Sequence, residues 1–267
     1  MQYTAIQNTN INVSRISFGT ASLHHLINST RRQTLLETAL SLGVTHFDTS
    51  PYYGHGLSEL DLGLLLKGRR GDLTVSTKVG LYPPNGSSQS VFNIWTRKIL
   101  GKFNPKLSKP EVDWSLKRAT LSINASLKRL NTDYVDFLFL HEPNMAIIET
   151  EEYTKWTEEL IKKGKIRHCG LAGLPKLIKP WIDKSHSLCQ IIQTRDSSSD
   201  RGLIKSFSNK GHIPQFTYGL LSHIPKSKPI NNIEKIMQNA LQRNSSGSVI
   251  VSTRKLSRLE ELTNIFR

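Results

Sequence analysis

The sequence predicts one (β/α)8 barrel, the TIM-barrel architecture, formed by a single domain over residues 1–267. Eight short apolar segments rich in β-branched residues follow one another along the chain, and most intervals between them have helical periodicity. Strands that alternate with helices form parallel sheets. Eight such units in a chain of this length favour a closed barrel over an open doubly wound sheet.

The eight expected strands are short and mostly apolar, as strands that are buried on both faces are. They are Ile16–Gly19, Thr45–Asp48, Leu73–Lys78, Val135–Leu140, Ile166–Leu171, Gln190–Thr194, Ile213–Thr217 and Ser248–Ser252.

Helices are expected where apolar residues recur at steps of three or four. One clear example is residues 114–130, where the apolar residues are Leu116, Ala119, Ile123, Leu127 and Leu130. The clearest expected helices are Arg32–Leu42, Trp114–Leu130, Tyr153–Lys163 and Leu256–Ile265.

Residues 81–110 form the irregular part of this pattern, because they are rich in Pro, Gly, Ser and Asn. We expect a long loop after the third strand, on the barrel face where active sites form. The chain stops at Arg267, soon after the last expected helix, which predicts a short C-terminus and an open pocket.

The chain is strongly basic, with 36 Lys and Arg against 21 Asp and Glu and a net charge of +15. Such a charge fits nucleic-acid binding, attraction to an anionic cofactor or substrate, or a solvated basic surface. The basic residues are spread along the chain without a nucleic-acid-binding motif, so no nucleic-acid partner is expected. The apolar runs are too short to cross a bilayer and the N-terminus is polar, so we expect a cytoplasmic protein without a membrane partner.

Several motifs of other enzyme classes are absent. No GxGxxG follows a strand, and neither a GxxxxGK[ST] phosphate loop nor an HExxH zinc motif is present. His24 and His25 are adjacent, but no acidic or cysteine ligand set accompanies them. No metal site is therefore predicted.

Four titratable residues fall at the ends of expected strands or in the loop just beyond. Asp48 ends the second strand, Lys78 ends the third, His141 follows the fourth and Tyr53 follows Asp48 in the loop. Because barrel strands are parallel, these residues share one rim. Tyr53 would deliver a proton, Lys78 would lower its pKa, Asp48 would keep Lys78 charged, and His141 would orient a substrate oxygen.

Each of these residues also has a structural interpretation. Asp48 alone could be a turn or N-cap residue, and Tyr53 alone could be a half-buried packing residue. Lys78 could be solvated, and His141 could be a core histidine with its hydrogen bonds satisfied. Their shared placement at one rim is what favours a catalytic interpretation.

Four ordered blocks resemble motifs of the aldo-keto reductase family. They are FDTSPYYG at 47–54 followed by LSE at 57–59, STKVG at 76–80, SLKRL at 126–130 leading through TDYVD to LHEP at 140–143, and GKIR at 164–167 with Gly170. The resemblance implies a (β/α)8 barrel and NAD(P)(H)-dependent carbonyl reduction or alcohol oxidation. It also implies that Asp48, Tyr53, Lys78 and His141 form the catalytic tetrad.

The resemblance extends in part to the residues that bind the cofactor. Gln193 matches the glutamine that binds the nicotinamide amide, whereas Ala172-Gly173 replaces the usual Ser-Asn pair. The run GLAGLP at 170–175 is similar to the galactose- and arabinose-dehydrogenase branch, which favours a sugar substrate. The loop that follows the expected seventh strand is shorter in this chain than is usual in the family. Near this loop, either Phe216 or Tyr218 could stack on the nicotinamide.

Residues 252–261 resemble the block that holds the adenosine side of the cofactor. Arg258 matches an arginine that contacts a 2′-phosphate, and Thr253 and Arg254 are its neighbours. Guanidinium groups suit phosphate, so NADP is favoured over NAD. The alternative is a basic first turn of an exposed helix.

Three functions follow in order of preference. The first is an oxidoreductase that transfers hydride between a nicotinamide and a small carbonyl compound or sugar. The second is an inactive or weakly active cofactor-sensing or scaffold relative, suggested by the missing amide and the shortened loop. The third, a nucleic-acid-binding barrel, rests on charge alone. The sequence predicts no oligomeric state.

Overall fold

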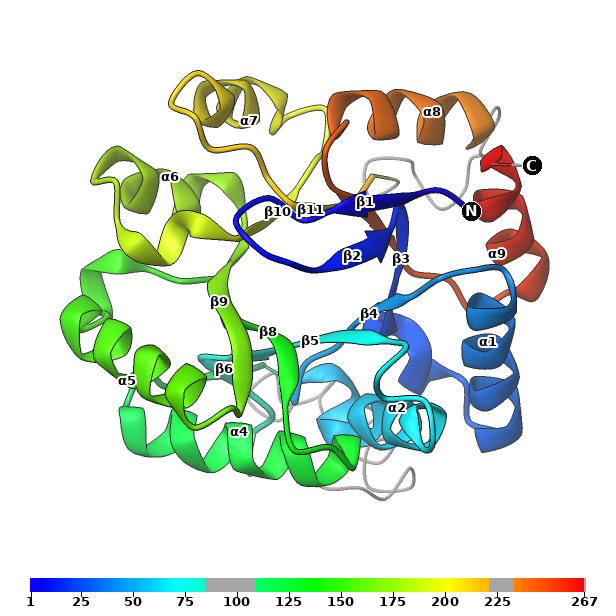
Figure 1. The fold of residues 1–267 in the computed structure, drawn as a ribbon, viewed down its shortest axis with the longest axis horizontal. Coiled ribbons are helices and arrows are strands. Elements are labelled where there is room, and N and C mark those ends of the chain that lie inside the picture. The colour runs from blue at the N-terminus through cyan, green and yellow to red at the C-terminus, as the bar shows by residue number, and fades with distance from the viewer. Residues whose placement is uncertain (85–108, 221–232, 267) are drawn as a thin grey trace.

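The computed structural model describes residues 1–84, 109–220 and 233–266. Eight parallel strands close into a barrel in the order β10-β11-β12-β3-β4-β5-β8-β9, and helices surround it (Figure 1). The expected (β/α)8 barrel is therefore confirmed.

The barrel strands lie close to the expected ranges. They are β3 (Ile16–Gly19), β4 (His46–Asp48), β5 (Thr74–Val79), β8 (Val135–His141), β9 (Ile166–Gly173), β10 (Ile192–Arg195), β11 (Phe216–Tyr218) and β12 (Ser248–Val251). The sixth and seventh begin later than expected. Residues Ser187–Gln190 form a 3-10 turn before β10, and Pro214 has no N–H to donate to a strand ladder before β11.

The helices lie outside the barrel, and most of them bury one face, whereas α2 is buried over most of its surface. They are α1 (Ser29–Ser41), α2 (Leu57–Leu66), α4 (Leu116–Leu130), α5 (Thr150–Lys162), α6 (Pro175–Asp183), α7 (Arg201–Ser208), α8 (Ile233–Arg243) and α9 (Leu256–Thr263). Local capping residues fix the ends of α4. At its start, Ser115 Oγ accepts a hydrogen bond from Arg118 N. At the other end, Asn131 takes the left-handed conformation that ends a helix.

Side chains along the barrel strands alternate between two cores. Phe47 and Val75 point outward into the core beneath the helices. Phe137, Phe139 and Phe216 belong to a separate inner core. The inner face therefore carries every second residue of each strand, and this alternation brings Asp48 and Lys78 onto the same inner surface.

A hairpin at the N-terminus closes one end of the barrel. Strands β1 (Tyr3–Ala5) and β2 (Asn12–Ser14) pair antiparallel and lie across the barrel in Figure 1. Val13 of β2 is buried in the inner core, together with Ile6 and Ile11 of the connection between the two strands. Since β2 leads directly into β3, the hairpin lies at the end where the strands begin, and it leaves the other end for a site. This hairpin was not among the elements expected from the sequence.

A second small sheet forms where the expected long loop after the third barrel strand begins and where it ends. Strands β6 (Leu81–Tyr82) and β7 (Glu111–Val112) pair antiparallel and bring the two ends of this segment together. Residues 85–108, the rest of the expected loop, lie outside the described residues.

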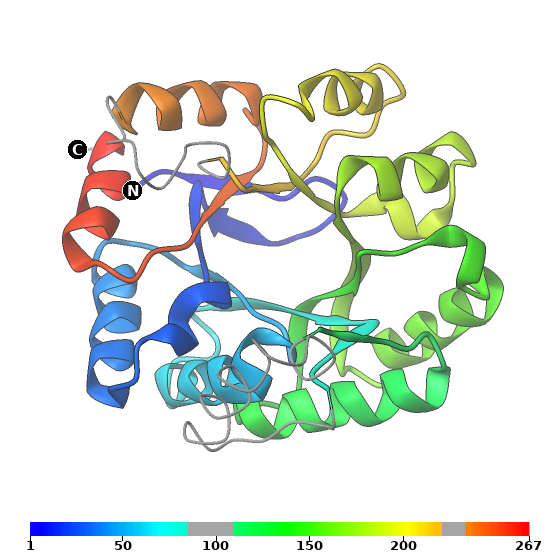
Figure 2. The ribbon, with the colours of Figure 1, turned by 180° about the vertical axis from the view of Figure 1, so that it is seen from behind.

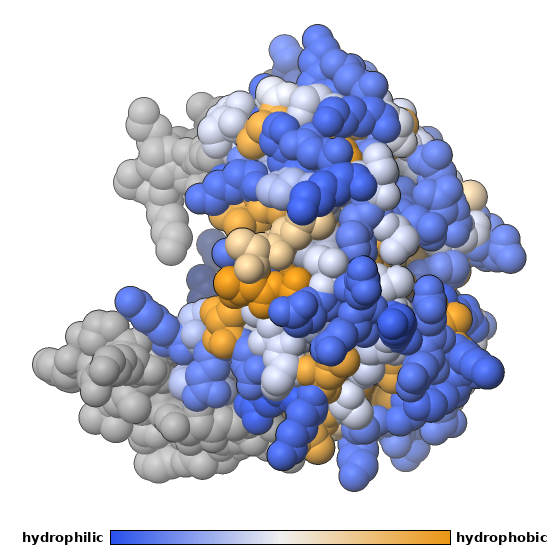
Figure 3. Space-filling model, turned by 90° about the vertical axis from the view of Figure 1, so that its left-hand side faces the viewer, coloured by the Kyte–Doolittle hydropathy of each residue, from blue (hydrophilic) through white to orange (hydrophobic). Residues whose placement is uncertain are grey.

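The surface on the side of α5 and α6 is mostly hydrophilic, with a smaller number of hydrophobic residues among them (Figure 3). The exposed hydrophobic residues there include Ile147 and Ile161. Within the described ranges, no helix combines the length and the apolar content that a bilayer crossing requires.

Candidate active site

A cavity of about 400 Å³ opens at the barrel end opposite the hairpin, the end that faces the viewer in Figure 2. Its wall contains all four residues of the predicted tetrad together with Gln193 and Tyr218. The residues come from five barrel strands and from one loop: Asp48, Tyr53, Lys78, His141, Gln193 and Tyr218. The structure therefore brings the predicted tetrad together.

Asp48 and Lys78 form a buried ion pair within this cavity. Lys78 Nζ donates to the two carboxylate oxygens of Asp48 at 2.7 and 2.8 Å, and to the Thr49 carbonyl oxygen at 2.9 Å. Asp48 Oδ1 also accepts from Ser76 Oγ at 2.7 Å and from Gln193 Nε2 at 3.0 Å. Buried charges are costly unless they are paired, so these contacts fix both side chains. Lys78 is therefore not a solvated lysine.

A tight turn after β4 positions Tyr53. Gly54, His55 and Gly56 all have positive φ values, of 61°, 54° and 88°. A Cβ atom at Gly54 would lie 2.4 Å from His24 Cβ, so this turn requires glycine. The turn sends Tyr53 back over the ion pair, and Lys78 Nζ lies 4.9 Å from the centre of the tyrosine ring.

The electrostatics of Tyr53 differ from the expectation. Desolvation raises the pKa of Tyr53 well above its usual value, and the carboxylates of Asp48 and Glu142 raise it further. The pKa of Tyr53 is therefore raised overall, because desolvation and the two carboxylates outweigh the stabilisation of the phenolate that the Lys78 ammonium can supply. Tyr53 is a neutral phenol at neutral pH and can act as a proton donor.

His141 is held in the neutral form. Burial lowers the pKa of His141 well below 6.5, and the Lys78 ammonium lowers it further. Its ring lies edge-on to Tyr53, with 6.1 Å between the ring centres. His141 Nδ1 is buried and has no hydrogen-bond partner within the described part of the chain. A neutral imidazole keeps one N–H, which it can donate to a ligand oxygen in the cavity.

Gln193 is the predicted nicotinamide ligand, and half of its amide is already engaged. Its Nε2 donates to Asp48, whereas its Oε1 is buried and has no partner among the described residues. A buried acceptor without a donor is unfavourable unless a ligand supplies one. The carboxamide N–H of a nicotinamide is such a donor. Ala172, which stands where relatives have a serine, lines the same cavity.

The structure separates the two candidates for aromatic stacking. Phe216 is completely buried, and its ring lies 4.6 Å from His46 and 5.2 Å from Phe137. Tyr218 lies two residues further along the same inward face and lines the cavity. Tyr218 can therefore contact a ligand, and Phe216 is a packing residue.

The predicted adenosine-side residues lie beyond the cavity wall. Ser252 lines the cavity, whereas Thr253, Arg254 and Arg258 do not. Arg258 lies in the first turn of α9, with its side chain 31% exposed and Nη1 3.3 Å from Glu261 Oε2. These three residues follow Ser252 in the sequence, and a cofactor in the cavity would have to extend past Ser252 to reach them.

Glu59, from the LSE motif at 57–59, makes structural contacts outside the barrel. It accepts hydrogen bonds of 2.7 Å from Arg129 Nε and from Thr77 Oγ1, and it is completely buried. The neighbouring Ser58 donates to the Thr20 carbonyl oxygen. These contacts tie α2 to α4 and β5.

Two polar residues of the site were not singled out from the sequence. Ser76, which lies two residues before Lys78 on β5, donates a hydrogen bond to Asp48. Glu142 follows His141, has a positive φ of 54° and lines the cavity. The signal for Ser76 was its spacing of two from Lys78, which places both side chains on one strand face. Nothing comparable identifies Glu142.

No three His, Cys, Asp or Glu side chains of the described residues come together as a possible metal site. His24 and His25 lie with their ring centres 4.2 Å apart.

Known proteins share both the sequence blocks and the barrel. L-galactose dehydrogenase of Arabidopsis thaliana is 32% identical over 190 residues, which cover 68% of this chain and 51% of that protein. Aldo-keto reductase YhdN of Bacillus subtilis is 32% identical over 179 residues, covering 65% of this chain and 47% of that protein. The chain thus spans about half the length of these curated relatives. The first of them agrees with the resemblance to the galactose-dehydrogenase branch.

The fold has a solved counterpart in the aldo-keto reductase AKR11C1 of Bacillus halodurans. The TM-score is 0.77 at 20% identity, over 100% of this chain and 91% of that one. The family match itself covers residues 15–191, which include Asp48, Tyr53, Lys78 and His141. With the barrel and these four side chains around one cavity, the chain belongs to the aldo/keto reductase family.

Proposed function

We propose that this protein is an NAD(P)(H)-dependent oxidoreductase that transfers hydride between a nicotinamide and a carbonyl or alcohol carbon, with an aldose as substrate. One observation carries the proposal. Tyr53 and His141 border a cavity whose floor is the buried Lys78–Asp48 pair, with its hydrogen bonds of 2.7 and 2.8 Å.

Residues of the cavity fit a nicotinamide. Gln193 Oε1 is a buried acceptor that the carboxamide N–H would satisfy, and Tyr218 offers an aromatic face in the same cavity. When bound, the reduced nicotinamide supplies hydride, that is, two electrons and one hydrogen nucleus. The chain's part is to hold the substrate carbonyl close to that position and to supply a proton.

The proton comes from Tyr53 in the direction of reduction. As the carbonyl carbon gains a C–H bond, its oxygen becomes negative and takes the hydroxyl proton of Tyr53, while the C=O π bond breaks. Lys78 lies beneath the ring and stabilises the resulting phenolate. The neutral His141 donates a hydrogen bond to the same oxygen and orients it. In the direction of oxidation these transfers run in reverse.

The scaffold alternative has less support. A barrel that only binds partners has no need for a buried lysine with its counter-ion beneath a tyrosine, since buried ion pairs contribute little net stability. The amide that is missing at Gly173 leaves Gln193 in place. The internal ion pairs also neutralise several arginines, including Arg32 and Arg129, which weakens the argument for nucleic acid from net charge.

Glu142 favours neutral over anionic sugars. One of its carboxylate oxygens accepts a hydrogen bond from Leu174 N at 3.1 Å, and the residue lines the cavity. Glu142→Gln should therefore raise kcat/KM for a uronic acid relative to the matching neutral aldose by about tenfold at pH 8. Steady-state assays with glucuronate and glucose measure this ratio. Glu142→Asp keeps the charge and should keep the wild-type ratio, and an unchanged ratio in Glu142→Gln would remove Glu142 from the substrate site.

Arg258 is proposed to contact the 2′-phosphate of NADP, which makes NADP the preferred cofactor. Arg258→Ala should weaken NADPH binding by about tenfold and leave NADH binding nearly unchanged, because a guanidinium contributes most where it meets phosphate. Binding is measured by fluorescence titration. Lys255→Ala, which removes a basic neighbour, is the control. Equal losses for both cofactors would support the interpretation of Arg258 as an exposed basic residue.

The proposed activity is tested by following the absorbance of reduced nicotinamide with a panel of aldoses and simple aldehydes, using NADPH and NADH separately. Saturable turnover of a sugar with either cofactor is the expected result. Turnover of simple aldehydes without any sugar would retain the reaction and reject the substrate class. Lack of turnover throughout the panel, in a folded protein that binds cofactor, would count against the activity.

A further inference from the structure

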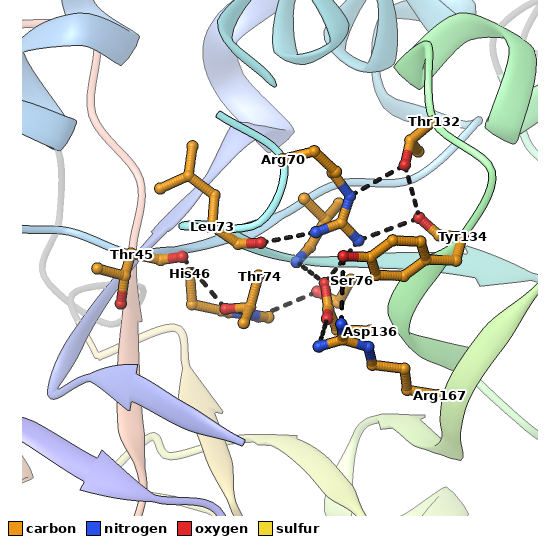
Figure 4. Close-up of polar contacts among 11 residues, drawn as sticks. Thr45, His46, Arg70, Leu73, Thr74, Ser76, Thr132, Tyr134, Asp136 and Arg167 are labelled. Atoms are coloured by element: carbon orange, nitrogen blue, oxygen red, sulfur yellow. Dashed lines mark hydrogen bonds and ion pairs between the residues drawn. The ribbon is translucent and has the colours of Figure 1, made fainter. Parts of the chain in front are cut away.

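Three inward-facing polar side chains lead from the closed end of the barrel to the catalytic aspartate. His46 Nδ1 lies 2.9 Å from Thr74 Oγ1, and His46 Nε2 lies 3.3 Å from Ser76 Oγ (Figure 4). Ser76 Oγ in turn donates to Asp48 Oδ1 at 2.7 Å. The strand register explains the order, since His46 pairs with Thr74 and Asp48 pairs with Ser76 between β4 and β5.

The chemistry of these groups fixes the direction of the hydrogen bonds. A carboxylate only accepts, so the single hydroxyl proton of Ser76 must point to Asp48. Ser76 can then only accept from His46, which requires a proton on Nε2. A neutral ring with N–H at Nε2 has a bare Nδ1, which accepts from the hydroxyl of Thr74 at 2.9 Å. The other acceptor within reach of this hydroxyl is the Thr45 carbonyl oxygen at 3.2 Å, which already accepts from Thr74 N at 2.9 Å. Each of the three donors therefore points toward Asp48.

His46 cannot take a second proton under ordinary conditions. It is completely buried, stacked 4.6 Å from the ring of Phe216, and burial lowers its pKa to about 3. The charges that act on it are the Asp48 carboxylate, which raises the pKa, and Lys78 and Arg70, which lower it. The ring thus remains neutral, and its single N–H can serve only one neighbour.

We propose that Thr74, His46 and Ser76 are positioning residues, a directed hydrogen-bonded chain that orients the Asp48 carboxylate and so holds Lys78 under Tyr53. The proposal rests on the function proposed above. A chain of aligned hydrogen bonds polarises each member, and each is strengthened in a buried site. Burying His46 and Ser76 in or beside the inner core of Phe137 and Phe216 would otherwise weaken that core, which apolar residues could fill without this cost.

The first test reads the tautomer of His46 directly and does not require activity. In protein labelled with 15N, the ring nitrogens of His46 should show the Nε2–H tautomer, unchanged between pH 8 and pH 5. The peaks are assigned with His46→Gln. In Ser76→Ala, which removes the acceptor of Nε2–H, the Nδ1–H tautomer should gain population. An Nδ1–H tautomer in the wild-type protein would overturn the proposal, whatever the outcome of the activity assays.

The second test compares hydroxyl groups on opposite faces of β5. Ser76→Ala should lower kcat by about tenfold with cofactor affinity unchanged, because a hydrogen bond to a charged group is lost. Ser76→Thr keeps the hydroxyl and should recover most of the activity. Thr77→Val is the matched control, since Thr77 Oγ1 donates to the Glu59 carboxylate at the same distance of 2.7 Å, outside the barrel. It should affect thermal stability more than kcat.

His46 variants keep the proposal testable if Ser76 variants fold poorly. His46→Gln places an N–H near Ser76 and should retain more turnover than His46→Leu, at equal cofactor affinity. Equal turnover of these two variants, or wild-type kcat in Ser76→Ala, would show that the chain serves packing alone. If the wild-type protein has no turnover, the proposed function fails and the tautomer measurement still decides whether the chain exists.

Discussion

Replacing Tyr53 with phenylalanine should reduce kcat by about 10²–10⁴, the range for loss of a general acid, and leave the affinity for NADPH and NADH nearly unchanged. The substitution removes one hydroxyl and keeps the ring that lies 4.9 Å from Lys78 Nζ. The Lys78–Asp48 pair and Gln193 do not depend on that hydroxyl for their hydrogen bonds. Steady-state kinetics and a fluorescence titration separate the two effects.

Tyr52 provides the matched control for this experiment. It is the adjacent tyrosine in the same turn, and it does not belong to the cavity wall. Tyr52→Phe should therefore keep turnover close to that of the wild type. Unchanged turnover in Tyr53→Phe would show that the proton comes from another group, and the assignment of Tyr53 would be wrong.

Replacing Arg70 with alanine should lower the free energy of unfolding by about 3 kcal/mol, because it removes the closest ion-pair partner of the buried Asp136 carboxylate. The carboxylate keeps the half-exposed Arg167 at 2.9 Å and the N–H of Val75 at 2.8 Å. Arg70 Nη2 lies 2.7 Å from Asp136 Oδ2, and the Asp136 side chain is completely buried. Arg70 also donates to the carbonyl oxygens of Leu73 and Tyr134, and its guanidinium lies 3.9 Å from the centre of the Tyr134 ring (Figure 4). Denaturant unfolding followed by circular dichroism measures the loss.

The preceding arginine makes the same type of ion pair at the surface. Arg69 Nη1 lies 2.7 Å from Glu37 Oε2, with the two side chains 39% and 48% exposed. Solvent screens such a pair, so Arg69→Ala should cost at most about 1 kcal/mol. Similar losses for Arg69→Ala and Arg70→Ala would mean that burial of Asp136 does not control the contribution of this pair.

The fold followed from the sequence where local signals were strong. The apolar face of α4, with Ala119, Ile123 and Leu130, is buried as the spacing predicts. The N-terminal hairpin was missed because its strands have three residues each and depend on contacts with Phe137 and Phe216, far away in the chain. Strands this short are specified by tertiary packing more than by their own sequence.

The site was predictable to the extent that it lies at strand ends. Asp48, Lys78 and His141 were found because parallel strands bring their ends to one rim. Choosing between Phe216 and Tyr218 required knowing which layer of the barrel each occupies, since both point inward. The raised pKa of Tyr53 could not be foreseen either, because it depends on desolvation and on Glu142, whose position follows from its backbone turn.

The cavity is proposed to hold a nicotinamide against Gln193 and Tyr53, and a fluorescence titration of the purified protein with NADPH and NADH tests this most directly. The account predicts saturable binding of one cofactor per chain, tighter for NADPH, and weaker binding of both in Gln193→Ala, which removes the buried acceptor. Lack of binding of either cofactor at millimolar concentration would contradict the account and give the lead to a scaffold role for the barrel.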